Sequence, residues 1–430
     1  MHISVIIPAY QVAPHVGRCL ASVLAQDVRD VEILVVNDGS TDGTAERCDA
    51  IAAREARVRV IHQPNRGLVA ARQAGAAAAT GDYVACIDGD DHVAPGYVGG
   101  LLRAARTTGA PVVVGGYVRE YRGNLARQRP VPPPGTYRGA ALQGLKDTCI
   151  AAPPFFSHAL TTYLWGKLFE RSLYVPHQQA VPTGLSLCED AACLFPLVAA
   201  CEAVAVTDAC DYTYVQHQGS MLKTTQGDGD RELARLRAAV RYLAGHPALR
   251  ADASYRSQLQ AFALGHYLMR SGATTTAPGG ATALFGHPVP DGSRVLVVGA
   301  GTFGQRVHSR LRACPAVRLA GWLDDDAAAY RLDGLPVDPV EALPRMDFDL
   351  AVIATLNPHG AHALASRCEW LGAPPESLLT LDDLGLAGIL ASTEFQRLQA
   401  EVPLDALPAW VPSAATAPFA GSCRTAPVPR

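Results

Sequence analysis

Short apolar runs alternate with helical segments over the first 117 residues of the chain. The runs are rich in β-branched residues and cover Ile3–Ile7, Glu32–Val36, Val58–Ile61, Tyr83–Ile87 and Val112–Val114. The helical segments between them cover His15–Gln26, Thr44–Ala56, Leu68–Ala79 and Pro95–Thr107. A strand that is apolar throughout is usually buried on both faces, as in a parallel sheet. The alternation therefore predicts right-handed βαβ units in a doubly wound α/β sheet.

The pattern changes after residue 117. Segment 118–165 lacks regular periodicity and contains a stretch rich in Arg and Pro at 127–135, so we predict a mobile loop region that forms a lid or contacts an acceptor. Residues 231–269 are helical in pattern and are predicted to form two helices, broken near His246 and Pro247.

Composition suggests where the domains end. Residues 271–292 are rich in Gly, Thr, Ala and Pro, which predicts a linker. Residues beyond 401 are rich in Pro and Ala, which is typical of a disordered tail. The predicted order is an α/β domain, a helical segment, the linker, a second α/β domain, and a short helix with the tail, at 1–225, 226–270, 271–292, 293–385 and 386–430.

Composition and charge narrow the function classes. The 430 residues are 49% hydrophobic, which is enough to build cores, and the formal net charge is −3 with both signs mixed along the chain. A nucleic-acid partner normally requires a basic excess or patch, so we expect none. The eleven cysteines include no CxxC pair, which makes a zinc site a weak alternative to reduced, partly buried thiols.

The N-terminal sequence bears on location. It begins a strand at once, with no basic region and no small-residue cleavage site. No stretch approaches the roughly 20 apolar residues of a membrane span. We therefore expect a cytoplasmic protein, with peripheral contact at the inner face of the membrane left open.

Polar segments follow four successive predicted strands and should meet at one edge of the sheet, where doubly wound folds bind ligands. They are Pro8-Ala9-Tyr10, Asn37-Asp38-Gly39-Ser40-Thr41-Asp42-Gly43-Thr44, Gln63-Pro64-Asn65-Arg66-Gly67-Leu68 and Asp88-Gly89-Asp90-Asp91.

The acidic cluster after the fourth strand is the most informative of these segments. Asp88, Asp90 and Asp91 repel one another unless a cation neutralises them. Mg²⁺ or Mn²⁺ takes oxygen ligands, typically one or two carboxylates plus substrate phosphates, and can neutralise a departing diphosphate. The alternative is a solvated acidic turn before the helix that starts near Pro95.

Two other residues have a functional and a structural interpretation. Asp38 could accept an N–H from a nucleotide base, but its segment is also dense in turn formers and helix caps. Arg72 could lean over donor phosphates, or it could be an ordinary surface residue of its helix.

Taken together and in this order, the segments resemble the inverting family 2 glycosyltransferases. The resemblance is carried by Val5-Ile6-Ile7-Pro8-Ala9-Tyr10, "VVNDGSTDGT", "NRGLVAARQAG" and "CIDGDD", and it covers roughly residues 2–220. It implies a GT-A fold, which is a single nucleotide-binding α/β domain.

The resemblance also implies roles for individual residues. Pro8, Ala9 and Tyr10 would line the nucleoside pocket, and Asp38 would recognise the base, typically uracil in relatives that use UDP-sugars. The residues beside the donor would be Asn65, Gly67 and Arg72. The metal- and ribose-binding motif would be Asp88, Asp90 and Asp91, with Asp90 and Asp91 favoured for direct metal contact.

Two later segments resemble the part of the family's site that activates the acceptor. They are Trp165-Gly166-Lys167-Leu168-Phe169 and Cys188-Glu189-Asp190. A single displacement needs a carboxylate that takes the proton of the acceptor hydroxyl, and Asp190, with Glu189 beside it, matches that position. The alternative is that the two carboxylates only stabilise the start of a helix through its dipole. Trp165 and His217 are weaker candidates for acceptor contact, and His217 alternatively for the metal or diphosphate.

The second α/β domain carries its own motif. The strand Arg294–Val298 leads into Gly299-Ala300-Gly301-Thr302-Phe303-Gly304 and a helix, and the next strand ends at Asp324. This resembles Rossmann nucleotide-binding domains, which implies that the backbone at Gly299, Gly301 and Gly304 approaches a pyrophosphate while Asp324 accepts from a ribose hydroxyl. NAD(P) is a candidate ligand, and a structural or dimerising module is the alternative.

These features predict a hexosyl or related transferase that uses a nucleotide-diphosphate sugar and Mn²⁺ or Mg²⁺. A bifunctional transferase with an NAD-linked sugar oxidoreductase, or a non-catalytic nucleotide-sugar-binding protein, are the alternatives. The acceptor is left open among glycans, lipid-linked molecules and small molecules, as is homo-oligomerisation.

Overall fold

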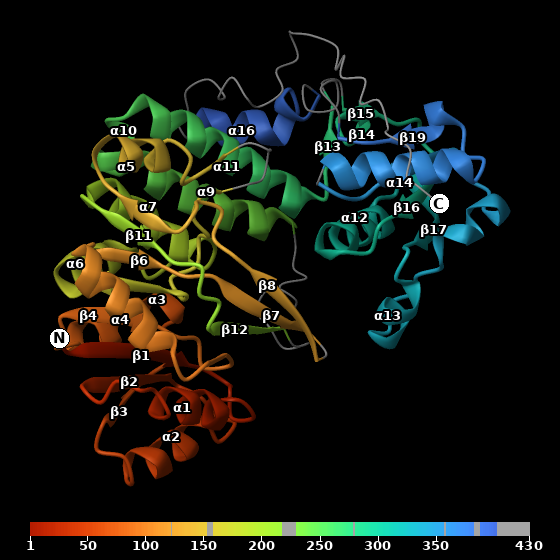
Figure 1. Cartoon of the computed structure of the whole chain (residues 1–430). Coiled ribbons are helices and arrows are strands. Elements are labelled where there is room, and N and C mark those ends of the chain that lie inside the picture. The colour runs from red at the N-terminus through yellow and green to blue at the C-terminus, as the bar shows by residue number, and fades with distance from the viewer. Residues whose placement is uncertain are drawn as a thin grey trace, which may run out of the picture. The chain divides into compact units, whose positions relative to one another are not determined.

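The computed structural model describes residues 1–121, 123–152, 158–216, 229–277, 280–356, 358–381 and 388–401. It divides into two compact units, the first built mainly from Met1–Tyr267 and the second mainly from Leu268–Arg397 (Figure 1). No helix among the described residues is both long and apolar enough to cross a membrane.

An eight-stranded sheet forms the centre of the first unit, in the order β3-β2-β1-β4-β10-β6-β11-β9. Figure 1 shows β1, β2 and β3 side by side near the N-terminus. The strands are β1 (Ile3–Ala9), β2 (Val31–Asp38), β3 (Val58–Gln63), β4 (Tyr83–Cys86), β6 (Val112–Val114), β9 (Gly135–Tyr137), β10 (Lys167–Glu170) and β11 (Val204–Val206). Strands β1 to β4 pair in parallel, as the sequence predicts, whereas β10 runs antiparallel to both β4 and β6. The predicted α/β class is confirmed, with a mixed rather than wholly parallel sheet.

Helices cover both faces of this sheet, which explains why its strands are apolar throughout. Alternate residues of β1 point to opposite faces: Ile3, Val5 and Ile7 pack on one side, and Ile6 packs on the other. The first side is covered by α1 (Val16–Leu24) and α4 (Tyr97–Thr108). The second is covered by α3 (Leu68–Ala78), α6 (Arg171–Ala180) and α7 (Glu189–Ala200).

Helix α3 lies unusually close to the sheet at Gly75. A Cβ added there would stand 2.4 Å from Cγ2 of Ile6 on β1. A larger residue would therefore push α3 away from the sheet. Arg72 also lies on α3, so this close packing fixes how far the Arg72 side chain stands from the carboxyl ends of the strands.

Region 118–165 differs from the loop region predicted from its sequence. Its described residues include helix α5 (Gly139–Lys146) and contribute β7 and β8 to a second sheet, in the order β5-β12-β7-β8. These strands are β5 (His92–Val93), β7 (Tyr117–Tyr121), β8 (Asn124–Gln128) and β12 (Tyr212–Gln216). The β7–β8 hairpin pairs with β12 from much later in the chain, a long-range contact that local periodicity cannot reveal.

The remaining helices of the first unit follow the sequence pattern closely. Helix α2 (Thr44–Ala52) connects β2 and β3. The predicted break near His246 separates α9 (Gly229–Gly245) from a short helix, α10 (Pro247–Arg250), which precedes α11 (Ala253–Ser271).

The second unit contains a four-stranded parallel sheet in the order β17-β16-β18-β19. Its strands are β16 (Ser293–Val298), β17 (Val317–Leu323), β18 (Leu350–Ile353) and β19 (Leu378–Leu379). Its helices are α12 (Thr302–Ala313), α13 (Ala327–Leu332), η1 (Val340–Arg345), α14 (Pro358–Trp370) and η2 (Pro375–Ser377), with α16 (Thr393–Glu401) belonging to it as far as Arg397. The predicted strand–turn–helix arrangement around the glycine motif is therefore present.

Segment 271–292 also differs from its prediction, which was a linker. It forms a three-stranded antiparallel sheet of β13 (Thr274–Thr276), β14 (Thr282–Leu284) and β15 (His287–Pro288). Leu284 and Phe285 are buried, and Phe285 packs against the ring of Phe303. Small and turn-forming residues here make short paired strands that belong to the second compact unit.

We expect Gly304→Ala to destabilise the second unit by about 1–3 kcal/mol, because overpacking forces backbone to move. A Cβ at Gly304 would stand 2.0 Å from the carbonyl oxygen of Gly299. Gly301→Ala is the matched control, since no atom lies within 4 Å of its added Cβ. Urea unfolding of the full chain, followed by circular dichroism, measures both. Equal stability of the two variants would contradict this account of the motif.

Candidate active site

The loops that follow β1 and β2 are tied together at the carboxyl edge of the sheet. The backbone N–H of Gln11 donates to Oγ of Ser40 at 3.1 Å, and that of Val12 donates to Oγ1 of Thr44 at 2.9 Å. Pro8 and Ala9 are buried at the end of β1, whereas Tyr10 is 49% exposed. An exposed ring on a fixed loop can stack on a planar ligand.

Asp38, the last residue of β2, hydrogen-bonds to the loop before α3. Its Oδ1 accepts from Nε2 of Gln63 at 2.7 Å and from the backbone N–H of Arg66 at 2.9 Å. Its Oδ2 accepts from the N–H of Gly67 at 2.8 Å, and Oδ1 of the exposed Asn65 accepts from the same N–H at 3.2 Å. Asp38 is 3% exposed, so it orders the predicted donor loop, and only its remaining lone pairs could accept from a base.

Arg72 connects the two acidic segments. Its guanidinium is 2% exposed, donates from Nη2 to Oδ1 of Asp88 at 3.1 Å, and bonds through Nη1 to Oδ1 of Asp190. Its Nε has no hydrogen-bond partner in the described part of the chain. Burial would lower the pKa of Arg72, but Asp190 and Asp88 raise it well above its usual value. This arrangement differs from the predicted contact with donor phosphates, because the guanidinium is buried between carboxylates.

Asp91 is held by strand β12. One oxygen accepts from the hydroxyl of Tyr212 at 2.5 Å and the other from the N–H of Val215 at 2.8 Å. Asp91 is 1% exposed, while Asp90 is half-buried. Burial, then Asp88 and Asp90, raise the pKa of Asp91 well above its usual value. Direct metal contact, predicted for both residues, therefore suits Asp90 better than Asp91 in this geometry.

Glu189 and Asp190 form the first turn of α7. Asp190 accepts from Arg72 and, through Oδ2, from the N–H of Leu164 at 3.3 Å. No other described residue bonds to the Glu189 carboxylate, which is half-buried. Burial, with a further contribution from Asp190, raises the pKa of Glu189 to about 7, although Arg72 opposes this.

Negative charge exceeds positive charge in this group. Among the described residues it holds five carboxylates and two basic side chains: Asp88, Asp90, Asp91, Glu189 and Asp190, with Arg72 and Lys167. Burial raises the pKa of Asp88 to about 6; Arg72 opposes this, while Asp190 and Asp90 add to it. Repulsion of this kind favours binding of a cation.

The described residues include no three His, Cys, Asp or Glu side chains placed as a complete metal-binding set. Such a set is not required for Mg²⁺ or Mn²⁺, which can be bound by one or two carboxylates together with substrate phosphates. The oxygen donor at Asp90 and the surplus negative charge therefore fit a cation that arrives with its phosphate-bearing ligand.

An aromatic column stands beside the carboxylates. Trp165 stacks between Tyr163 and Tyr212, with ring centroids 4.3 Å and 4.5 Å away. Tyr117 contacts the column edge-on, at 4.9 Å from Trp165. Trp165 is 2% exposed, which leaves the half-buried Tyr163 as the better candidate for acceptor contact.

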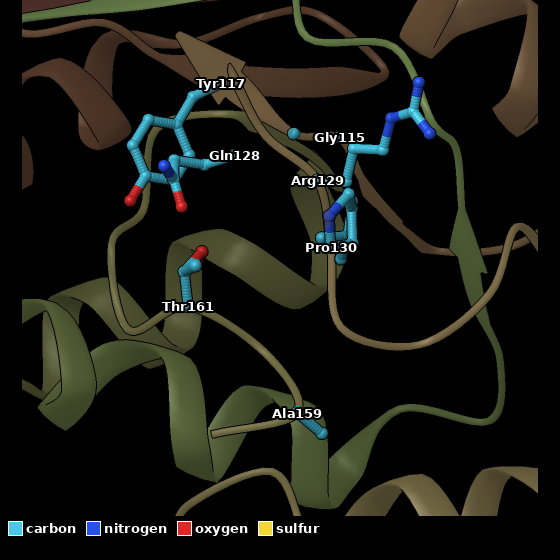
Figure 2. Close-up of a pocket in the computed structure, with 9 residues that line it drawn as sticks. Gly115, Tyr117, Gln128, Arg129, Pro130, Ala159 and Thr161 are labelled. Carbon is cyan, nitrogen blue, oxygen red and sulfur yellow. The ribbon is translucent and has the colours of Figure 1, made fainter. Parts of the chain in front are cut away.

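A pocket of about 220 Å³, including space open to solvent, lies between the β7–β8 hairpin and residues 159–161. Figure 2 shows Tyr117 beside Gln128, with Thr161 facing them and Arg129 turned away. None of its lining residues is a predicted site residue, and it is smaller than most ligand pockets. The strand-end chemistry is therefore a better guide to the site than this pocket.

Side chains of the second unit hydrogen-bond to the backbone of its glycine loop. Asp324 accepts from the N–H of Ala300 at 2.6 Å and from that of Asp326 at 2.8 Å. Trp322 donates to the carbonyl oxygen of Gly299 at 2.9 Å. The carboxylate predicted to meet a ribose thus already supports the loop, and nucleotide binding here stays a prediction. His217 lies outside the described residues.

Two contributors to the site were missed by sequence reasoning. Tyr212 holds Asp91 and also accepts from the N–H of Asp88 at 3.2 Å. Lys167, which is 0% exposed, donates to the carbonyl oxygen of Tyr163, the neighbour of Leu164, whose N–H bonds to Asp190. Lys167 lies in a segment that carries the family resemblance, but only the long-range pairing of β12 and β10 gives these two residues their roles.

Comparison with known proteins places part of the chain beside a known family. The sequence model of the family described as Glycosyl transferase family 2 matches residues 4–158. This part of the chain is therefore similar in sequence to the family 2 glycosyltransferases.

Two curated relatives are similar over parts of the chain. The uncharacterized glycosyltransferase EpsJ of Bacillus subtilis is 31% identical over 226 residues, which are 51% of this chain and 62% of that protein. The glycosyltransferase GlyG of Streptococcus pneumoniae serotype 4 is 38% identical over 116 residues, 27% of this chain and 38% of that protein. The chain thus spans less than two thirds of the length of these relatives.

Among solved structures, residues 1–349 of S. aureus TarS in complex with UDP-GlcNAc are 17% identical, with a TM-score of 0.49. The match covers 62% of this chain and 73% of that chain.

Proposed function

We propose that the chain transfers a sugar from a nucleotide-diphosphate donor to an acceptor hydroxyl, with inversion and with the help of a divalent metal. The similarity to family 2 and the names of the relatives support sugar transfer. The observation that carries the proposal is the Arg72 bridge, which joins Asp88 after β4 to Asp190 at the start of α7. It brings Asp88, which we propose lies on the donor side, close to Asp190, which we propose lies on the acceptor side.

The donor is proposed to lie across the ends of β1 to β4. Tyr10, beside Pro8 and Ala9, would meet the nucleoside, for which uridine is the expected base. Asp38 keeps the Asn65–Gly67 loop in place and contributes its remaining lone pairs to the base. Hexosyl donors are the expected class.

Mn²⁺ or Mg²⁺ is proposed to be held by Asp90 and the donor diphosphate, where it would neutralise the charge of the leaving group. Asp91 is proposed to act indirectly, since its hydrogen bonds to β12 fix the turn that carries Asp90. Asp88 faces Arg72 and completes the acidic motif.

Asp190 is proposed as the general base, with Glu189 as its neighbour. As the acceptor oxygen bonds to the anomeric carbon, its proton passes to Asp190, and the bond from that carbon to the diphosphate oxygen breaks. Attack opposite the leaving group inverts the anomeric centre. Glycans, lipid-linked molecules and small molecules are the acceptor classes to be tested.

Calorimetry with UDP, with and without Mn²⁺, tests the donor site. We expect manganese-dependent binding to the wild type and a loss of at least about tenfold in affinity for Asp90→Asn, since a metal ligand is removed. Asp30→Asn is the control, because Asp30 is exposed at the opposite end of the sheet. Unchanged UDP binding in Asp90→Asn would remove the metal assignment. A parallel titration with NAD⁺ tests the glycine loop of the second unit.

A further inference from the structure

A buried lysine that the proposed chemistry does not use lies close to the base. Lys167 opens β10, between β4 and β6, and is 0% exposed. Its Nζ donates to Oγ1 of Thr161 at 2.9 Å and to the carbonyl oxygen of Tyr163 at 2.6 Å. Among the described residues no carboxylate bonds to it, although burial of a charged group is costly without compensation.

Both acceptors of Lys167 lie in one short segment, residues 161–165, which we call the strap. The strap connects three features of the site. Thr161 lines the pocket beside β7, Tyr163 stacks on Trp165, and the N–H of Leu164 donates to Asp190. A shift of the strap would move all three together.

We propose that Lys167 is a positioning residue for sugar transfer, which holds the strap so that Leu164 orients Asp190 and Tyr163 forms the wall that meets the acceptor. This inference rests on the proposed function, since it assigns the strap to the acceptor side of that reaction. The residue touches no reacting atom; it acts through the backbone of Tyr163 and Leu164.

The chemistry of lysine suits this task. Its ammonium group has three donors on a compact head, so it can bind a hydroxyl and a carbonyl of neighbouring residues at once. Burial lowers the pKa of Lys167 to about 7, with Asp190 opposing the shift, and a neutral amine still donates two hydrogen bonds. Methionine has a similar length and no donor, so Lys167→Met would leave the strap without its anchor.

The test compares Lys167→Met, Lys167→Arg and Thr161→Val with the full-length wild type. Hydrogen–deuterium exchange of 158–165 reports the strap, UDP calorimetry with Mn²⁺ reports the donor site, and UDP release from UDP-GlcNAc, UDP-glucose and UDP-galactose reports chemistry. For Lys167→Met we expect faster exchange in the strap, UDP affinity within about twofold, and kcat lower by about 10²-fold, as for other small misplacements of a catalytic group. Lys167→Arg should recover part of kcat, and Thr161→Val should lose less than Lys167→Met.

Each outcome has a distinct meaning. Unchanged exchange in the strap of Lys167→Met, or a kcat within threefold of wild type, would overturn the inference. A fall in thermal stability with kcat of the folded protein intact would mean that Lys167 only stabilises the fold, which also overturns it. Absence of UDP binding and UDP release in the wild type would instead refute the proposed function, and the exchange result would still decide whether Lys167 holds the strap. Thr161→Val keeps the experiment decisive if Lys167→Met does not fold.

Discussion

Replacing Arg72 by methionine should abolish transfer and destabilise the first unit by about 3–5 kcal/mol, the usual cost of removing one partner from a buried ion pair. Arg72 is 2% exposed, and its two partners, Asp88 and Asp190, are 28% and 14% exposed. Without the guanidinium, both carboxylates would remain close together and poorly hydrated. Each would then take up a proton or turn away, and Asp190 would lose its orientation.

Urea unfolding at pH 7.5, with UDP release measured on the folded fraction, provides the comparison. Arg47→Met is the matched control, since Arg47 is exposed on α2 and should change stability by no more than about 0.5 kcal/mol. The double variant Arg72→Met with Asp190→Asn should be more stable than Arg72→Met alone, because one of the two unpaired charges is gone. Additive losses in the double variant would mean that the ion pair contributes nothing beyond packing.

The sequence predicted the parts of the site that depend on local pattern. Strand ends followed by polar turns put Asp38, Asp88 and Asp90 at one edge, because parallel strands end together. The acidic helix start, given as the alternative for Glu189 and Asp190, is also present, because both residues lie in the first turn of α7. Acidic residues in a first helical turn are a local signal.

The partners of these residues were not predictable from the sequence, since they come from distant segments. Arg72 looks like a surface residue of an amphipathic helix, and only its contact with Asp190, 118 positions later, makes it central. Asp91 looks equivalent to Asp90 until β12 pairs with β5 and β7 and brings Tyr212 to it. Region 118–165 was predicted to lack regular structure for the same reason, because its hairpin is completed by β12.

Asp190→Asn should lower kcat by about 10²–10⁴-fold and leave UDP affinity unchanged, because it removes the proton acceptor but not the donor site. Asparagine keeps the shape and one of the two oxygens, which can accept from Arg72 or from Leu164, so one bond is lost and the fold should survive. Asp42→Asn is an unsuitable control, since Asp42 accepts bonds from Ala13 and Thr44. Asp147→Asn is suitable, because Asp147 is exposed just after α5 and its bond is to the exposed Gln143 of that helix, and it should leave kcat unchanged. Weaker UDP binding by Asp190→Asn would mean that this carboxylate belongs to the donor site.

Glu189→Gln decides which of the two adjacent carboxylates takes the proton. The pKa of Glu189 is about 7 in the folded protein, so it is protonated below that pH and charged above it. Its negative charge favours proton transfer to Asp190, so wild-type kcat should rise with pH through about 7. Glu189→Gln should then lose this rise and keep the activity that the wild type shows below pH 7, and inactivation as complete as in Asp190→Asn would instead make Glu189 the base.

The same shift predicts an effect on stability with a definite sign. The folded pKa of about 7 lies above the ordinary value of 4.5, so the folded state holds the Glu189 proton more tightly than the unfolded chain does. Glu189 therefore weakens the fold increasingly as pH rises from 4.5 through 7, because ionisation of a half-buried carboxyl beside Asp190 is unfavourable. Glu189→Gln should be more stable than wild type at pH 8 and nearly equal to it at pH 4.5. Such a cost to stability next to the proposed base is what we expect if the charge of Glu189 acts in the reaction.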